Sequence, residues 1–352
     1  MRDRRFGRQI LHLATRAELG WSEPPAHIQP FLDVERHSLL ELEPPKHTRL
    51  RNLINRAFVS RQVERLGPRI AALANGLIDA FEGRGEVDLL EHFATRIPVV
   101  VIAELLGVPT DMSTHLLDWS HRMVAMYQFG CSRAIEDSAV AATREFAAFL
   151  RDYVAQRRGG RTDDLISQLI TAESDEGRLS EEELITTCIL VLNAGHEATV
   201  HGLGNGAKAV LEARIDPRAA FATPAASAAI VEELLRFDAP LHLFTRYALE
   251  DVVFDGVALR RGDKIGLLLG AANRDPERFP DPDRLDAVRS PNPHVTFGAG
   301  IHFCIGAPLA RLEMEVALPI LFRRLPGLRL AEPPRYRDSY HFHGLAALPV
   351  GW

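Results

Sequence analysis

Apolar side chains recur at helical spacing along most of this chain. Within residues 61–81 they stand three or four positions apart, which places them on one face of a helix. The segment 132–157 shows the same spacing. The pattern predicts a largely helical protein whose helices pack through one apolar stripe each. In the first of these segments the stripe consists of Val63, Leu66, Ile70, Leu73, Leu77 and Phe81.

One later helix differs from the others because it is apolar on nearly every side. The run Ser180-Glu181-Glu182-Glu183 is a capping box, in which a serine is followed three residues later by a glutamate, and it opens a helix that runs to about Glu212. The middle of this segment, residues 185–198, lacks a polar face. We therefore expect a long helix that passes through the centre of the domain.

Strand signals are confined mainly to residues 245–270. Two short apolar runs, 252–254 and 257–259, flank Asp255-Gly256, a dipeptide typical of hairpin turns. Residues 264–269 follow as a further strand, and residues 271–296 are dense in Pro, Asp and Arg, which predicts irregular coil. The sequence thus predicts a mainly α fold with one small sheet, forming a single domain over residues 1–352.

Composition and charge exclude several classes of protein. With 46% hydrophobic and 25% charged residues, the chain has the profile of a soluble globular protein, and its net charge of −6 argues against a nucleic-acid partner. It contains no run of 18 apolar residues, and no apolar segment follows the basic N-terminus, so neither a membrane span nor a signal peptide is expected. Its cysteines are far apart and form no C-x-x-C pair, which fits a reducing, cytoplasmic location; they are Cys131, Cys188 and Cys304.

The segment 297–306, F-G-A-G-I-H-F-C-I-G, carries the strongest chemical signal. Its glycines permit backbone angles that a side chain forbids and allow close approach to a bulky group. Cys304 stands just before the start of an apolar helix, where the helix dipole favours thiolate over thiol. One cysteine cannot complete a structural zinc site, and a His302–Cys304 ligand pair has no second pair to join it. A lone thiolate can instead bind a haem iron, although an inert buried cysteine also fits.

By spacing, this segment matches F-x-x-G-x-x-x-C-x-G, the cysteine loop of the cytochrome P450 family, which the chain resembles over nearly its whole length. The resemblance implies the P450 fold, with haem b held between the central helix and the cysteine loop. It implies Cys304 as the axial iron ligand, with Phe297 and Gly306 among the cofactor-binding residues.

A haem also carries two propionates, and buried carboxylates need cationic donors. The run H-T-R-L-R, residues 47–51, resembles the family's H-x-x-x-R motif and sets His47 and Arg51 one helical turn apart. Arg246 matches the arginine at the start of the strand that follows the family's E-x-x-R helix. His302, two residues before the cysteine, matches a position where the family often has a propionate-binding histidine or arginine.

Residues 194–199, A-G-H-E-A-T, resemble the oxygen-activation motif A/G-G-x-D/E-T of this family. The small residues Ala194 and Gly195 would leave space beside a flat cofactor, and Glu197 matches the acid that feeds protons to oxygen. The next position, usually threonine, is Ala198, and Thr199 projects about 100° away around the helix. Proton delivery would then rely on Glu197 and Thr199, ordered water or a substrate hydroxyl. Taken alone, the run also fits a close-packed helix crossing.

Glu233 and Arg236 are three residues apart and so share one helix face. Such a pair is common and is usually a solvated surface couple worth under about 1 kcal/mol. Here it resembles the E-x-x-R helix of the family, whose pair contacts the irregular segment before the cysteine loop, with Arg289 matching the third partner. We expect these three residues to have a structural role.

The resemblance implies a haem-thiolate monooxygenase that uses O2 and electrons from NAD(P)H to oxidise a small or medium apolar substrate. No flavin or nicotinamide fingerprint is evident, so a separate ferredoxin- or flavodoxin-type protein with its reductase would supply the electrons. A cluster of arginines is either a positive patch for such a donor or a set of solvated helix faces; they are Arg49, Arg51, Arg56, Arg61, Arg65, Arg69, Arg311, Arg323 and Arg324. Candidate substrate contacts are Leu39, Leu40, Leu192, Leu243 and Phe244.

Two departures from the family keep other functions open. Family members usually carry a further helix and further strands before a segment like residues 3–6, so we expect a misassigned start or a truncated chain, with an unpaired sheet edge. Pro319 is expected to interrupt or kink the helix after Cys304 at a cost of about 3 kcal/mol. The alternatives are a peroxide-using or dehydrating haem-thiolate enzyme, which Ala198 favours, and a non-catalytic haem-binding homologue.

Overall fold

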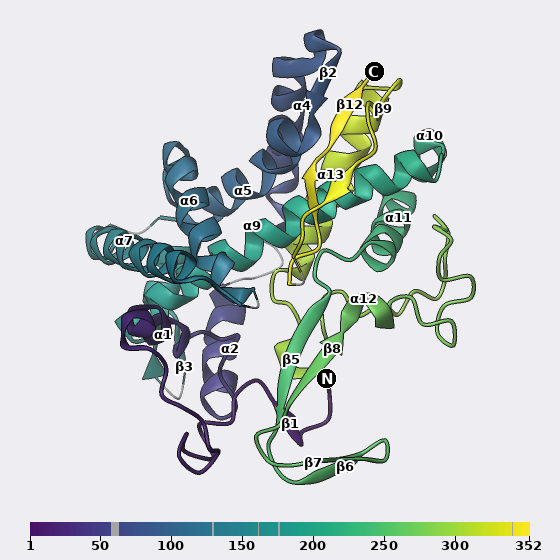
Figure 1. The fold of residues 1–352 in the computed structure, drawn as a ribbon. Coiled ribbons are helices and arrows are strands. Elements are labelled where there is room, and N and C mark those ends of the chain that lie inside the picture. Colours follow the sequence, from purple (N-terminus) through teal and green to yellow (C-terminus); the bar gives the residue numbers. More distant parts are fainter. Residues whose placement is uncertain (58–62, 129, 161, 175–176, 340) are drawn as a thin grey trace.

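The computed structural model describes residues 1–352 except 58–62, 129, 161, 175–176 and 340 (Figure 1). Helix α9, Glu181–Glu212, runs through the middle of the molecule and is buried along most of its length. Both capping-box bonds are present: the N–H of Glu183 donates to Ser180 Oγ at 3.2 Å, and the N–H of Ser180 donates to Glu183 Oε2 at 2.9 Å. The sequence therefore predicted correctly where the central helix starts and ends, and that it is buried in the middle of the domain.

Several helices pack against α9 and bury its apolar surface, and five of them contact it most extensively. One of them, α7, begins where the sequence predicts it, because the Ser132 side chain caps it by accepting the N–H of Ile135. The five are α5 (Arg96–Leu106), α6 (Ser113–Val124), α7 (Arg133–Arg157), α11 (Pro224–Phe237) and α13 (Ala307–Arg324).

Shorter helices complete the helical part of the fold. They are α1 (Gln29–Glu35), α2 (Lys46–Ala57), α4 (Gly67–Phe81), α8 (Leu165–Thr171), α10 (Pro217–Ala220) and α12 (Leu269–Ala272), with the single turns η1 (Ala26–Ile28), η2 (Glu82–Arg84), η3 (Leu90–Ala94), η4 (Thr110–Met112), η5 (Ala125–Tyr127) and η6 (Gly300–His302). No helix in the described part of the chain combines the length and the apolar character that crossing a membrane requires.

The first amphipathic helix starts later than its apolar spacing predicts. Helix α4 begins at Gly67, and residues 61–62 lie outside the described part of the chain. Pro68 stands in the first turn, where its missing N–H would have had no partner in the helix. The predicted stripe still faces inward, since Ile70 and Phe81 are buried and Val63 joins the same core from the segment before the helix.

The predicted strands belong to an antiparallel sheet and to a hairpin beside it, and a two-residue strand that the sequence did not predict, β1, joins the sheet. The sheet has the order β1 (Phe6–Gly7), β5 (Leu243–Ala248) and β8 (Lys264–Leu268), and the hairpin pairs β6 (Val252–Phe254) with β7 (Val257–Leu259). Asp255 and Gly256 both have positive φ angles, 50° and 78°, as the two-residue turn requires. Within the described residues β8 pairs with β5 alone, so its other side is an open edge.

The sequence missed several very short strands. These are β2 (Glu86–Asp88), β9 (Arg329–Leu330) and β12 (Pro349–Gly351), which form a second three-stranded sheet, and the pairs β3 (Glu173–Ser174) with β4 (Gly177–Arg178) and β10 (Arg335–Tyr336) with β11 (Leu345–Ala347). Strands of two or three residues are too short to show alternation. The prediction of one small sheet was therefore incomplete.

Pro319 lies inside α13, and the helix continues on both sides of it to Arg324. The predicted interruption is wrong. The helix packs against α4, α9 and α11, and this tertiary packing outweighs the loss of one backbone hydrogen bond. The coil predicted for residues 271–296 is correct after the end of α12 at Ala272.

Candidate active site

The cysteine loop folds back on itself before α13. Gly298 and Gly300 have φ angles of 71° and 76°, in the left-handed region that favours glycine. The N–H of Cys304 donates to the carbonyl of Phe297 at 3.0 Å, which fixes the cysteine across the loop from the aromatic residue. A Cβ on Gly300 would lie 2.9 Å from the carbonyl oxygen of Met1, so this glycine also permits a close backbone approach.

The protonation of Cys304 differs from the expectation based on its position. Burial raises the pKa of its thiol, and this outweighs the backbone N–H groups of Gly306 and Ala307 and the charge of Arg51, which lower it. The helix end therefore does not by itself make the thiolate the preferred form. A bound metal ion would do so, because coordination displaces the thiol proton.

His47, on α2, is buried and has no hydrogen-bond partner for either ring nitrogen. Its ring lies 4.4 Å from that of His302, and His302 Nε2 is 3.4 Å from Glu43 Oε1. Burial, followed by the charges of His302 and Arg51, lowers the pKa of His47 to about 4. A buried imidazole without a partner is costly, so this position is suited to a polar group that the chain itself does not provide.

Two arginines add positive charge to the same region. Burial lowers the pKa of Arg51, and burial together with the charge of Arg8 lowers the pKa of Arg246 to about 10. Arg246 donates to the backbone carbonyl of Thr245, and within the described residues neither Arg51 nor Arg246 forms an ion pair with a carboxylate. The cations of this region and Cys304 thus fit a bound group that bears two carboxylates and a metal ion. The cations would pair with the carboxylates, and the cysteine thiolate would bind the metal.

The small residues of α9 have separate roles. Ala194 is exposed although most of the helix is buried, and Ala198, four residues on, is partly exposed on the same face. Gly195 does not open this face, because a Cβ there would lie 2.7 Å from Cδ1 of Ile102 on α5. Its smallness permits the close crossing of α5 and α9, and only the alanines leave room on the open face. The Thr199 hydroxyl donates to the carbonyl of Gly195 at 3.0 Å.

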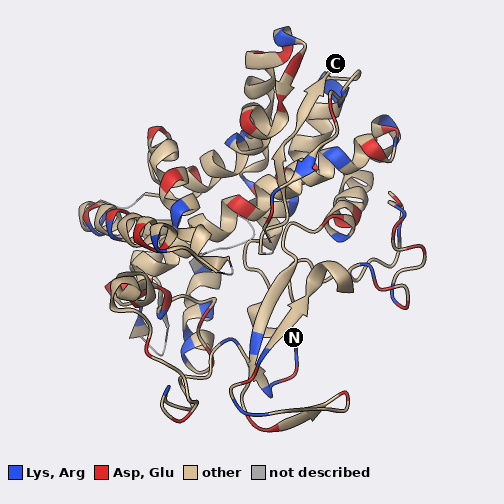
Figure 2. Cartoon of the chain, in the orientation of Figure 1, with Lys and Arg blue, Asp and Glu red and all other residues tan. Residues whose placement is uncertain are grey.

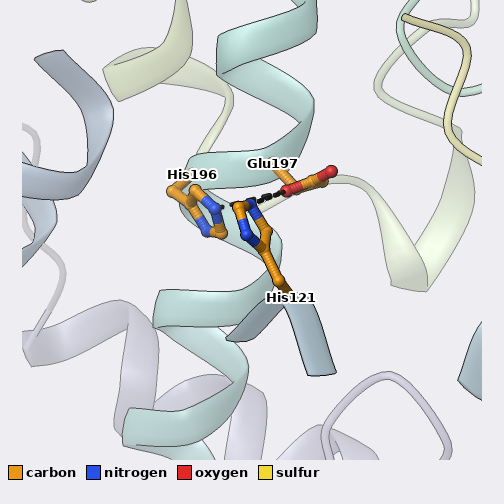
Figure 3. Close-up of side chains that lie close together, drawn as sticks. All are labelled: His121, His196 and Glu197. Atoms are coloured by element: carbon orange, nitrogen blue, oxygen red, sulfur yellow. Dashed lines mark ion pairs between the residues drawn. The ribbon is translucent and has the colours of Figure 1, made fainter. Parts of the chain in front are cut away.

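Glu197 is buried among histidines that the sequence analysis did not connect with it (Figure 3). His121 Nε2 and His196 Nε2 lie 3.2 and 3.3 Å from its Oε2, while His201 Nε2 and Arg337 Nη1 lie 3.3 and 3.5 Å from its Oε1. Burial acts to raise the pKa of Glu197, but contacts with the three histidines hold it well below its usual value. Glu197 is therefore an ionised carboxylate surrounded by three histidines and an arginine.

Glu233, Arg236 and Arg289 meet in the core. Arg236 donates two hydrogen bonds of 2.8 Å to the two carboxylate oxygens of Glu233, and Arg289 Nε lies 3.1 Å from both oxygens. Arg236 also donates to three backbone carbonyls of the irregular segment, those of Asn273, Pro282 and Arg284. The pair is fully buried, so it is not the solvated surface couple that its spacing alone would suggest.

A neighbouring ion pair, which the sequence analysis missed, connects α11 with the cysteine loop. Arg311 of α13 donates to Glu232 at 2.6 Å and lies 4.5 Å from the ring centroid of Phe297. His294 Nε2 contacts the same carboxylate at 3.1 Å. Burial opposes ionisation, but Arg311 and His294 together lower the pKa of Glu232 to about 2.

The arginines considered for a positive patch are mostly paired with acids, and both signs of charge are interspersed over the helices (Figure 2). Arg61 lies outside the described residues. The observed pairs are Arg49–Glu183, Arg65–Asp163, Arg69–Glu104, Arg311–Glu232 and Arg324 with Asp79 and Glu82. These pairs leave less unbalanced positive charge than the sequence suggests.

Three features together define a haem-thiolate protein. They are one cysteine in a glycine loop, cations that have no carboxylate partner in the described part of the chain and can bind two carboxylates, and an open helix face. A model of the cytochrome P450 family matches residues 227–330. The polyketide biosynthesis cytochrome P450 PksS of Bacillus subtilis is 36% identical over 99% of this chain and 85% of its own length. The chain belongs to the cytochrome P450 family.

Solved structures agree with this assignment. P450BioI, in complex with an acyl carrier protein ligated to hexadec-9Z-enoic acid, superposes with a TM-score of 0.91 at 34% identity and covers 100% of this chain and 88% of that chain. Myxobacterial CYP267B1 in complex with myristic acid gives 0.88 at 39% identity, covering 99% and 86%. The protein is thus a P450 monooxygenase with haem b as its cofactor and the mainly α P450 fold.

Replacing Arg51 by methionine should affect the haem-free and haem-bound proteins in opposite directions. Without haem, the change removes a half-buried charge that forms no ion pair with a carboxylate of the described residues, and it should stabilise the fold by up to about 1 kcal/mol. With haem, it should speed haem transfer to an acceptor protein, because the resemblance to the family implies that Arg51 binds a propionate. Urea unfolding of the apoprotein and the rate of haem transfer measure the two effects.

The control for this experiment is Arg49→Met on the same helix. Arg49 contacts Glu183, so its loss should destabilise the apoprotein and leave haem transfer unchanged. A loss of apoprotein stability in Arg51→Met would contradict the role assigned to Arg51.

One candidate substrate contact, Phe244, lies beside a group of other rings. Leu39 and Leu192 are buried, whereas Leu40, Leu243 and Phe244 are partly exposed. Phe244 lies 5.9 Å from the ring of His341, which in turn lies 5.5 Å from that of Tyr127. The Tyr127 hydroxyl donates to Glu35 Oε1 at 3.2 Å, and burial, with the charge of Glu41, raises the pKa of Glu35 to about 8.

We expect Glu35→Gln to remove a pH-dependent loss of stability. Because its folded pKa of about 8 exceeds the ordinary 4.5, the folded protein binds more protons than the unfolded chain between these values. The free energy of unfolding therefore falls as pH rises through this window, by at most about 1.4 kcal/mol per pH unit, and is level above it. The variant should melt above the wild type at pH 8 and close to it near pH 4.5. Glu23→Gln, at an 82% exposed side chain, is the control; a wild-type–Glu35→Gln difference that does not change with pH would contradict the prediction.

Proposed function

We propose that this monooxygenase hydroxylates an apolar chain, of the fatty-acyl or polyketide class, with electrons from NAD(P)H delivered by a ferredoxin- or flavodoxin-type protein. The observation that carries the proposal is the open face of α9 at Ala194 and Ala198, in a protein whose candidate substrate contacts are Leu and Phe side chains. An apolar substrate that enters such a site gains free energy from burial alone.

The bound haem supplies the activation of O2. In the proposed site Cys304 would provide the thiolate that binds the iron, and His47, Arg51, Arg246 and His302 would bind the propionates. Arg236, Glu233 and Arg289 hold the irregular segment before the cysteine loop and take no part in the reaction.

Glu197 is the group that would pass protons to the open face of α9. Its contact with His121, whose side chain is 45% exposed, connects the buried carboxylate to solvent. Ala198 carries no hydroxyl, and the Thr199 hydroxyl donates to a carbonyl of its own helix. A water or a substrate hydroxyl would then complete the proton path.

Two relatives support the substrate class, because one solved structure holds a fatty acyl group on an acyl carrier protein and another holds myristic acid. The name of PksS connects that protein with polyketide biosynthesis. The separate electron donor is inferred from the lack of a flavin or nicotinamide fingerprint in the sequence. Arg323, which is exposed, would contribute to its docking surface.

The test is a titration of the purified haem protein with myristate, a hexadecenoyl acyl carrier protein and a macrolactone, followed by the shift of the Soret band. We expect a saturable shift with the acyl or macrolactone ligands, and product only when NADH, a reductase and ferredoxin or flavodoxin are present. Turnover with hydrogen peroxide alone would favour the peroxide-using alternative, which the missing hydroxyl at Ala198 supports. No Soret shift with any of the ligands would overturn the substrate class.

A further inference from the structure

We propose that His121, His196 and Glu197 bind a Zn²⁺ ion, and that the bound ion withholds Glu197 from proton transfer. The first half concerns binding alone and is independent of the proposed function. The second half rests on the role proposed for Glu197. The three side chains come from two helices, α6 and α9, and point toward one another (Figure 3).

The spacing of the ligand atoms suits a tetrahedral metal. The nitrogens of His121 and His196 lie 3.2 and 3.3 Å from Glu197 Oε2, and all three atoms lie within 4.8 Å of one another. Zinc bonds of about 2.0–2.1 Å place neighbouring tetrahedral ligands about 3.3–3.4 Å apart. The distances from Glu197 Oε2 to the two histidine nitrogens therefore nearly match those between the ligands of a tetrahedral zinc ion. A small rotation of the partly exposed His121 ring would bring its nitrogen to the same distance from that of His196.

The environment of His196 points to a ligand. The residue is fully buried, yet its Nε2 has no hydrogen-bond partner, because its approach to Glu197 lacks hydrogen-bond geometry. The other nitrogen, Nδ1, lies 3.4 Å from the carbonyl of Leu192 and 3.3 Å from Ser120 Oγ. A proton on Nδ1 would be donated to that carbonyl, which leaves a lone pair on Nε2, the form that metals bind.

The side chains around Glu197 leave one of its carboxylate oxygens, Oε2, available to bind the metal. His201 and Arg337 contact Oε1, whereas His121 and His196 contact Oε2. Arg337 is 47% exposed and can turn toward solvent when a cation binds. Two imidazoles and a carboxylate suit Zn²⁺, whereas Mg²⁺ and Ca²⁺ prefer oxygen ligands. The exposed His121 gives the ion access from solvent.

The experiment measures Zn²⁺ binding to the haem-loaded protein, free of any histidine tag, by isothermal titration calorimetry. We expect one equivalent of Zn²⁺ to bind the wild type and no Mg²⁺ to bind. His121→Gln should weaken Zn²⁺ binding at least tenfold and abolish the rise in melting temperature that Zn²⁺ causes. His115→Gln, an exposed histidine on the same helix, is the matched control and should bind Zn²⁺ as the wild type does.

Equal Zn²⁺ binding by the wild type and His121→Gln, or none by the wild type, would overturn the site. Inhibition is measured separately, as the fraction of each protein's own Zn²⁺-free product formation that added Zn²⁺ removes. This fraction should be large in the wild type and in His115→Gln and small in the activity that His121→Gln retains. Since binding is read by calorimetry, a failure of the proposed oxidation would leave the metal site testable. Zn²⁺ binding without inhibition would refute only the effect on proton transfer.

Discussion

Replacing Cys304 by serine is expected to abolish both the red-shifted Soret band of the reduced, CO-bound protein and monooxygenase turnover. That band depends on a thiolate opposite CO, and we propose that Cys304 supplies it. Serine preserves the size of the side chain and the backbone of the loop, so haem can still bind between the propionate donors. Absorption spectra of the reduced protein with CO, together with product formation, measure the two losses.

Cys131→Ser is the matched control for this prediction. The Cys131 thiol lies near the carbonyls of Ala125 and Gln128, and a serine hydroxyl can donate to the same oxygens. This variant should retain both the band and turnover. Persistence of the red-shifted band in Cys304→Ser would show that the iron ligand is another residue.

Replacing Arg236 by alanine is expected to lower the free energy of unfolding by about 3–5 kcal/mol, because breaking a buried ion pair leaves uncompensated polar groups. Glu233 would lose its bidentate partner, and the carbonyls of Asn273 and Pro282 would each lose a donor. Urea unfolding of the haem-loaded protein measures the effect. If this variant does not fold, Arg289→Ala, which removes a second donor to Glu233, should still be destabilised by about 1–3 kcal/mol.

Arg133→Ala is the control. Arg133 also forms an ion pair, with Asp137 at 2.8 Å, but both side chains are more than half exposed. Its loss should cost under about 0.5 kcal/mol. Equal losses for Arg236→Ala and Arg133→Ala would contradict the structural role assigned to the buried pair.

Both variants involve residues that a local motif identifies, but the motif alone does not give their environment. The spacing of Glu233 and Arg236 fits a weak surface couple equally well, and only the packing of residues 273–292 around them makes the pair a buried anchor. Likewise, the position of Cys304 before a helix suggests a thiolate, whereas burial in the folded chain raises the pKa of the thiol. Burial therefore reverses the pKa shift that the position of Cys304 implies, and it enlarges the stabilising effect that the spacing of Glu233 and Arg236 implies.

Other features depend on residues that are remote in the chain. The cage around Glu197 combines a histidine of α6, two of α9 and Arg337 from the C-terminal part, and no short pattern connects these positions. The short strand β2 pairs with β12 at the other end of the chain. Helix α13 continues through Pro319 because α4, α9, α10 and α11 pack against it.

The sequence by itself determined the features that depend on residues close together in the chain. Apolar spacing and caps set the central helix and α7, Asp255-Gly256 set the hairpin, and the cysteine loop indicated the family and its haem. These signals are local, since each acts through residues a few positions apart. The tertiary structure alone decided which charges are buried, paired or left without a partner, because burial and long-range contacts exist only once distant segments pack together.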